Sequence, residues 1–189
     1  MILMPRDLLL VIDMQNVYCA GGAWSCPGAE KAAERIKSVI ARKGKDMDVI
    51  FTRFLASPDP KGVWKDYNRE NGEINRDPHA NGMMEAFREE LEQYPLYTKS
   101  VYSSLDIPEV REAVQKADRV IVSGVVAECC VLSTVFALID DGRYVIYLTD
   151  GVAGLDRETE KAVETVLSGL EPLHIKKETC AEFLNEDSE

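Results

Sequence analysis

The strongest constraint on the fold is a short apolar run that recurs along the chain. The first such run, LLLVID at residues 8–13, is apolar throughout and ends in a carboxylate. Strands that are buried on both faces have this pattern, and they are typical of parallel sheets. Comparable runs lie at residues 47–54, 94–100, 118–125, 143–150 and 173–178. We therefore expect a largely buried parallel sheet.

Segments with apolar residues at helical spacing separate these runs. The clearest is residues 29–44, where the apolar side chains form one stripe and Gly44 marks the end. Further helices are expected at residues 83–94, 107–117, 128–140 and 156–170. Strands that alternate with helices predict a three-layer α/β/α domain around the sheet.

Local signals refine the ends of these elements. Asp106 is a candidate cap for the helix at 107–117, and Pro108 suits its first turn. The acidic tail at 181–189 is expected to fray.

The length, net charge and cysteine content of the chain limit its domain number, its partners and its location. A chain of 189 residues suits one domain, which we place at residues 1–189. Its formal charge of −11 disfavours nucleic acid as a partner. The first apolar run is bracketed by acidic residues and is too short to span a membrane. The five cysteines are odd in number and irregularly spaced, so we expect a reducing, cytoplasmic location rather than a disulfide framework.

One long segment, residues 55–82, lacks a clear pattern. It is polar, rich in turn residues, and contains Trp64 and Tyr67. A loop of this length in a compact domain is usually functional or disordered. We interpret it as a lid or a substrate-binding loop, with a plain surface excursion as the alternative.

Chemically useful side chains follow three of the expected strands. Asp13 follows the first strand, Lys99 ends the third, and the pair Cys129–Cys130 follows the fourth. Ligands of open α/β sheets bind beyond the carboxyl ends of the strands. A helix N-terminus and a lysine favour a thiolate, and a carboxylate can accept the proton of a thiol. The three positions therefore predict a nucleophilic site.

Each of these residues also has a structural interpretation. Asp13 could cap a turn, Lys99 could be solvated, and a cysteine is often simply buried. The adjacent cysteines could also form a redox pair, although a disulfide between them would distort the helix. A two-cysteine metal clip needs spaced ligands, so adjacency argues against it.

Three motifs in order resemble the isochorismatase-like cysteine hydrolases, a family that includes nicotinamidases and N-carbamoylsarcosine amidases. These motifs are LLLVIDMQNVY, YTKSVYSSL, and the segment that begins VSGVVAECCVLST. The resemblance covers about residues 8–170. It implies a Rossmann-like, six-stranded parallel sheet, and it implies dimers or tetramers.

The resemblance also assigns roles. It implies a catalytic triad of Asp13, Lys99 and Cys130, because the family nucleophile lies six residues after a glycine and precedes a valine, here Gly124 and Val131. Cys129 would then be packing or a pocket wall.

A cis peptide bond at the end of the fourth strand, between Val125 and Val126, is also implied by the resemblance. It would aim the N–H of Val126, together with that of Cys130, at a developing oxyanion.

Two departures from the family pattern bear on the activity. Nicotinamidases carry metal-binding histidines shortly after the second strand, whereas the only histidines here are His79 and His174. The threonine that often precedes the nucleophile by three residues is replaced by Ala127. We therefore expect a metal-independent enzyme without a cofactor, and the triad is intact.

The sequence thus predicts hydrolysis of a C–N amide or ureido bond in a small molecule through a thioester. The alternatives are hydrolysis of a vinyl ether and a non-catalytic or redox protein that uses the adjacent thiols. The substrate itself is not identified. Candidate pocket residues are Arg53, which could bind a carboxylate, and the aromatic residues Phe54, Trp64, Tyr102 and Tyr18.

Overall fold

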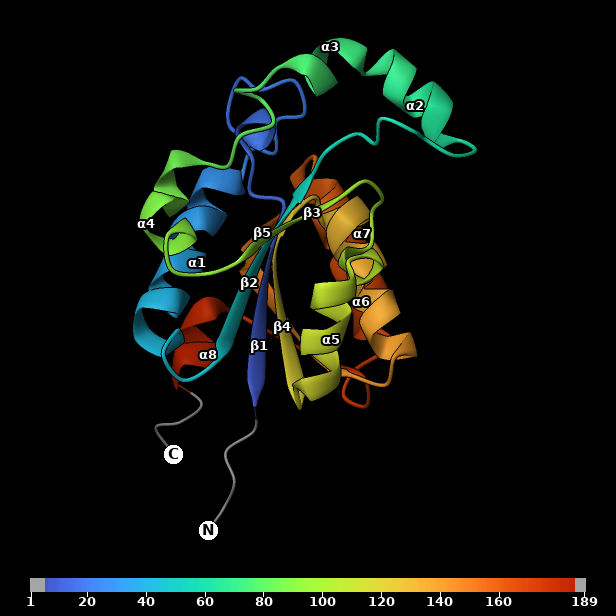
Figure 1. Cartoon of the computed structure of the whole chain (residues 1–189). Coiled ribbons are helices and arrows are strands. Elements are labelled where there is room, and N and C mark those ends of the chain that lie inside the picture. Colours follow the sequence, from blue (N-terminus) through green and yellow to red (C-terminus); the bar gives the residue numbers. More distant parts are fainter. Residues whose placement is uncertain (1–5, 186–189) are drawn as a thin grey trace.

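Six parallel strands form the centre of the computed structural model, which describes residues 6–185 (Figure 1). Along the chain they are β1 (Asp7–Ile12), β2 (Asp48–Phe54), β3 (Leu96–Lys99), β4 (Arg119–Val125), β5 (Tyr144–Ala153) and β6 (Ile175–Glu178). Their order in the sheet is β3-β2-β1-β4-β5-β6, and every neighbouring pair is parallel. The order reverses between β1 and β4, which is the point at which sheets of this kind bind ligands. The predicted α/β class and the six-stranded parallel sheet are confirmed.

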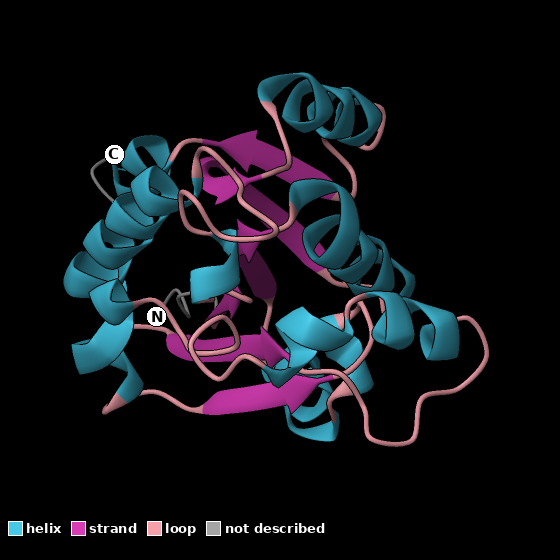
Figure 2. Cartoon of the chain, turned by 90° about the horizontal axis from the view of Figure 1, so that it is seen from above, coloured by secondary structure: helices cyan, strands magenta, loops and turns pink. Residues whose placement is uncertain are grey.

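Helices cover both faces of the sheet (Figure 2). On one side lie α1 (Ala29–Lys43), α4 (Arg88–Leu91) and α8 (Cys180–Asn185), and on the other lie α5 (Pro108–Lys116), α6 (Leu132–Asp140) and α7 (Arg157–Ser168) (Figure 1). A hydrophobic core lies on each face of the sheet, and alternate residues of β1 belong to one or the other. Leu9 and Val11 pack towards α1, while Leu8, Leu10 and Ile12 pack towards α5 and α6. All of β1 is buried, which explains why its sequence is apolar rather than alternating.

Residues 55–82 lie beyond the carboxyl ends of the strands (Figure 1). They contain two short helices, α2 (Trp64–Glu70) and α3 (Gly72–Arg76), which the sequence analysis did not anticipate. Neither helix has a buried residue. Within the described residues, no helix is both long and apolar enough to cross a membrane.

Three local expectations were wrong. The helix expected at 83–94 is a 3-10 turn at Glu85–Phe87 followed by the single-turn α4, because Met83 pairs with Gln15 and the N–H of Met84 donates to Met14 O. The remaining helix-forming stretch is therefore short.

Asp106 does not cap α5. It ends a 3-10 turn (Ser104–Asp106), and Ile107 occupies the N-cap position without a side-chain hydrogen bond.

Part of the tail that was expected to fray is helical. In α8 the side chains of Phe183 and Leu184 are buried, and the Cys180 N–H donates to Asp150 Oδ1 at 2.6 Å. Apolar burial and this hydrogen bond outweigh the acidic composition of the segment. Residues 186–189, the rest of the predicted tail, lie outside the described residues.

Candidate active site

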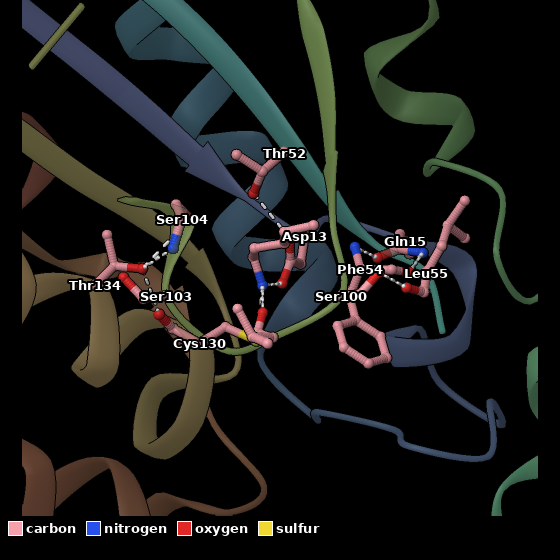
Figure 3. A network of polar contacts seen from close by, with 12 residues as sticks. Asp13, Gln15, Thr52, Phe54, Leu55, Ser100, Ser103, Ser104, Cys130 and Thr134 are labelled. Atoms are coloured by element: carbon pink, nitrogen blue, oxygen red, sulfur yellow. Dashed lines mark hydrogen bonds and ion pairs between the residues drawn. The ribbon is translucent and has the colours of Figure 1, made fainter. Parts of the chain in front are cut away.

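Asp13 lies at the carboxyl end of β1, at the centre of the sheet. Its backbone has φ of 53°, which turns the chain sharply out of the strand. Its N–H donates to Thr52 O at 3.0 Å, and its carboxylate Oδ1 accepts from the Thr52 hydroxyl at 2.8 Å (Figure 3). The side chain is fully buried. A neighbouring strand therefore fixes the carboxylate from two directions.

Lys99 connects this carboxylate to the thiol. Its Nζ donates to Asp13 Oδ2 at 2.6 Å, to Cys130 Sγ at 3.2 Å and to Val101 O at 3.2 Å. An ammonium has three donors, and these acceptors use all of them. The Phe54 ring lies beneath, with its centroid 5.6 Å from Nζ.

Cys130 lies in a π-helical turn (Ala127–Val131) that leads from β4 into α6. The Thr134 hydroxyl donates to Cys130 O at 2.7 Å and accepts from the Ser104 N–H at 3.0 Å (Figure 3). Cys130 is buried, whereas Cys129 is half-buried, and both are free thiols. Of the two adjacent cysteines, it is Cys130 whose thiol contacts Lys99.

Burial and opposing charges set the ionisation of this group. Burial raises the pKa of the Cys130 thiol, the negative charge of Asp13 raises it further, and Lys99 lowers it. Burial lowers the pKa of Lys99, but the charges of Asp13 and Cys130 outweigh burial and leave that pKa raised. Both raised pKa values favour the protonated forms, an ammonium at Lys99 and a thiol at Cys130.

The end of β4 supplies backbone groups to the same place. The Val125–Val126 peptide bond is cis, as the family resemblance implied. Gly124 has φ of 108°, and a Cβ there would lie 2.1 Å from Ile12 O, so only glycine lets β4 pass this close to β1. The Val126 N–H donates to no other residue in the described part of the chain.

A pocket of about 380 Å³ opens above the thiol. Val126, Glu128, Cys129 and Cys130 line it from the turn after β4. Rings of four residues also line it: Tyr18, Trp24, Tyr67 and Tyr102. The volume suits a small molecule.

Some of the residues predicted to form the pocket line it in the structure, and others do not. Tyr102 and Tyr18 line it. Phe54 and Trp64 do not line the pocket but pack against residues that do or against each other. The ring centroid of Trp64 lies 5.0 Å from that of Tyr102 and 5.9 Å from that of Phe54. Arg53 lies outside the lining, and its Nε donates to Thr98 Oγ1 at 2.9 Å.

Sequence reasoning missed Trp24, Tyr67 and Glu128 as pocket residues. Trp24 belongs to the segment that leaves the carboxyl end of β1, and Glu128 precedes Cys130 by two residues, so both lie near recognisable motifs. Tyr67 reaches the pocket because α2 packs its ring 6.4 Å from that of Trp24. The interpretation of residues 55–82 as a substrate-binding loop pointed to this segment, but no sequence pattern singled out Tyr67 or its contact with Trp24.

The metal site of nicotinamidases has no counterpart in the loop after β2. Asp66 pairs with Arg69 at 2.6 Å, and the side chains of Asp59 and His79 are exposed. Within residues 6–185, no three His, Cys, Asp or Glu side chains are grouped so that they could hold a metal ion. The residues therefore do not fit such a metal.

A family profile described as the isochorismatase domain matches residues 7–171. The chain belongs to the isochorismatase family. The match spans the sheet from β1 to the helix before β6, and it includes Asp13, Lys99 and Cys130. Membership in this family supports a hydrolase as the class of function.

Solved structures of isochorismatase-like proteins resemble this one over nearly its whole length. A cysteine hydrolase from Pseudomonas syringae pv. phaseolicola has a TM-score of 0.81 and 22% identity, covering 95% of this chain and 91% of that one. A pyrazinamidase/nicotinamidase from Streptococcus mutans has a TM-score of 0.70 and 19% identity, covering 90% and 99%. N-carbamoylsarcosine amidase from Thermoplasma acidophilum has a TM-score of 0.69 and 18% identity, covering 93% and 96%. At these identities the likeness establishes the fold. A search of curated proteins returns no match.

Proposed function

We propose that this isochorismatase-family protein is a metal-independent cysteine hydrolase that cleaves a C–N amide or ureido bond in a small molecule. The observation that carries the proposal is the buried contact of the Cys130 thiol with the Lys99–Asp13 ion pair at the base of the pocket. A buried thiol without this pair would be inert, because burial alone raises its pKa. The pair supplies both a base and a fixed positive charge.

In the first half-reaction Asp13 accepts the Cys130 proton while Sγ attacks the substrate carbonyl carbon. The new C–S bond gives a tetrahedral oxyanion, which accepts hydrogen bonds from the N–H groups of Val126 and Cys130. Asp13 then returns the proton to the nitrogen as the C–N bond breaks. The amine, or ammonia, leaves and a thioester remains.

In the second half-reaction water replaces the amine. Asp13 accepts a proton from the water as its oxygen attacks the thioester carbonyl. The C–S bond breaks, the thiolate is reprotonated from Asp13, and the acid leaves. Throughout, the Lys99 ammonium stabilises the negative charge that moves between Asp13 Oδ2 and Cys130 Sγ. Its hydrogen bonds to both atoms also keep the two side chains close together.

A panel of small primary amides and ureides, assayed for ammonia release, tests this function. Mass spectrometry of the protein during turnover should show an added acyl mass on the peptide that contains Cys130. The Cys129→Ala variant is the matched control, because its thiol is adjacent but makes no contact with Lys99. Turnover by Cys130→Ala, or an acyl mass on Cys129, would overturn the proposal.

The vinyl-ether alternative predicts a different result on the same protein. Such a reaction needs no acyl-enzyme, so it would release pyruvate without an added mass on Cys130. The redox alternative predicts a facile Cys129–Cys130 disulfide under mild oxidation. These outcomes separate the three functions.

A further inference from the structure

The pocket wall consists of aromatic rings that support one another. Trp24 lies 5.9 Å from Tyr18 and 6.4 Å from Tyr67, measured between ring centroids. Tyr67 in turn packs edge-on against Trp64 at 5.2 Å, and Trp64 packs against Tyr102. Ring faces of this kind attract cations and planar groups alike.

Glu128 is the only acidic or basic side chain among the residues that line the pocket within the described part of the chain. Its Oε1 accepts from the Leu155 N–H at 3.2 Å, and a Cβ at Gly154 would lie only 2.8 Å from Oε2. Oε2 therefore packs against the Gly154 backbone. It is buried and accepts no hydrogen bond from any residue between 6 and 185, while the Glu128 side chain as a whole is half-buried and lines the pocket. A partly buried carboxylate without a basic partner in the pocket lining favours a positively charged ligand.

The surroundings of the pocket are negative as well. Glu160 accepts from the Gly154 N–H at 2.9 Å, next to the bond that Glu128 makes. Burial, followed by the charges of Glu128 and Glu160, raises the pKa of the Cys26 thiol in the pocket wall to about 12. Lys99 is already committed to Asp13 and Cys130.

We propose that the substrate is a cationic amide, with an ammonium or guanidinium group that binds between the aromatic wall and the Glu128 carboxylate. The inference rests on the amidase function proposed above and names the class of substrate for it. An anionic ureide or amide would place a carboxylate near Glu128 with no basic side chain in the pocket lining to receive it. Arg53, the residue expected to bind such a carboxylate, lies outside that lining.

Three amides with the same four-carbon spacer test the inference. They are 5-aminopentanamide, which is cationic at neutral pH, its neutral isostere hexanamide, and the anion adipamate. A charge-assisted hydrogen bond typically changes affinity by about 10- to 100-fold. We therefore expect kcat/KM to be higher for the cation than for hexanamide by about this factor, and to be lowest for adipamate.

Glu128→Gln removes the charge but keeps an oxygen that can accept from the Leu155 N–H. It should bring the cation-to-neutral ratio of kcat/KM close to one. Glu160→Gln is the matched control, since Glu160 also accepts from a backbone N–H in this loop but does not line the pocket. Because the Glu160 charge lies outside the lining, Glu160→Gln should lower the preference far less than Glu128→Gln does. Circular dichroism and thermal unfolding check that both variants fold.

Calorimetry on Cys130→Ala measures binding of the same three compounds without turnover. Suppose that Cys130→Ala binds the cation selectively, that Cys130→Ala/Glu128→Gln does not, and that the unaltered protein releases no ammonia from any of the three amides. This result would support the cation site and contradict the amidase function. Turnover of the three amides at similar rates, unchanged in Glu128→Gln, would support the amidase function and overturn the cation site. A preference for adipamate would also overturn it.

Discussion

Asp13→Asn should separate the ionisation of the thiol from turnover. In the structure the Asp13 charge raises the pKa of Cys130 and Lys99 lowers it. Asparagine removes the negative charge but preserves the size of the side chain and can still accept from the Thr52 hydroxyl. Of the three groups, only the Cys130 thiol can then carry a negative charge beside the Lys99 ammonium. We therefore expect a lower thiol pKa, and hence more thiolate at neutral pH, in a variant that no longer turns over.

The size of the effect follows from the burial of the site. Two charges about 4 Å apart interact by roughly 4 kcal/mol at an effective dielectric constant near 20. Since about 1.36 kcal/mol corresponds to one pKa unit, the thiol pKa should fall by about 1–3 units. A thiolate of lower pKa is also less nucleophilic, with a Brønsted coefficient of about 0.5. Below the pKa, the alkylation rate should therefore rise by about 3- to 30-fold, whereas loss of the proton shuttle should slow turnover by about 10²- to 10⁴-fold.

Iodoacetamide labelling of Cys130, followed by mass spectrometry across a pH series, measures the first quantity. Ammonia release measures the second. Loss of one partner of a buried ion pair can cost about 3–5 kcal/mol, so thermal unfolding must confirm that the variant is folded. Thr52→Val is the matched control, because it removes a hydrogen bond to Asp13 without removing the charge. It should leave the labelling rate close to that of the unaltered protein.

The opposite result would refute this reasoning. If labelling of Cys130 in Asp13→Asn slows together with turnover, Asp13 promotes the resting thiolate instead of opposing it. The site would then hold a preformed ion pair, and the proton transfer assigned to Asp13 in the first step would be unnecessary.

Four further predictions concern the same site. Cys130→Ala should abolish ammonia release while Cys129→Ala retains most of it; turnover that survives in Cys130→Ala and is lost in Cys129→Ala would move the nucleophile to Cys129. Thr134→Val should lower the free energy of unfolding, measured with urea, by about 1–3 kcal/mol, because Cys130 O and the Ser104 N–H lose their hydrogen-bond partner; an unchanged midpoint would show that packing alone holds the turn around Cys130. Gly124→Ala should cost about 3 kcal/mol or more, because the new Cβ meets the Ile12 backbone at a positive φ; near-normal stability would contradict this close approach. Exhaustive treatment with a chelator should leave turnover intact, with no stoichiometric zinc or iron by elemental analysis; a tightly held metal whose removal stops turnover would restore a nicotinamidase-like mechanism.

Much of the fold was predictable because burial on both faces leaves a clear trace in sequence. The apolar runs located all six strands to within a few residues. The errors came where tertiary contacts overrode local pattern. The helix expected at 83–94 is shorter because residues 83–84 form backbone contacts with residues 14–15 instead. The acidic segment of α8 is helical because the side chains of Phe183 and Leu184 are buried.

Within the site, the groups at strand ends were predictable and the pocket wall was predictable only in part, since Tyr18 and Tyr102 were expected there and Trp24, Tyr67 and Glu128 were not. Asp13, Lys99 and Cys130 come together because parallel strands end on one edge of the sheet. Trp24 and Tyr67 meet only because the intervening loops fold over that edge, and no periodicity encodes the course of a loop. One such constraint is visible: the buried Gln15 side chain donates to Phe54 O and Asn81 O, both at 3.0 Å, and so joins three distant segments.

The contrast between the base of the pocket and its wall has a consequence for how a substrate reaches the thiol. Every residue of β1 is buried in the middle of the sheet, whereas α2 and α3 have no buried residue. Amide hydrogens in β1 and β4 should therefore exchange with solvent only on global unfolding, while those of α2 and α3 exchange through local openings of much lower free energy. We expect an opening of α2 to move Tyr67 away from Trp24, on which it packs, and to leave the groups at the strand ends in place. Small molecules would then enter and leave the pocket repeatedly while Asp13, Lys99 and Cys130 keep their positions.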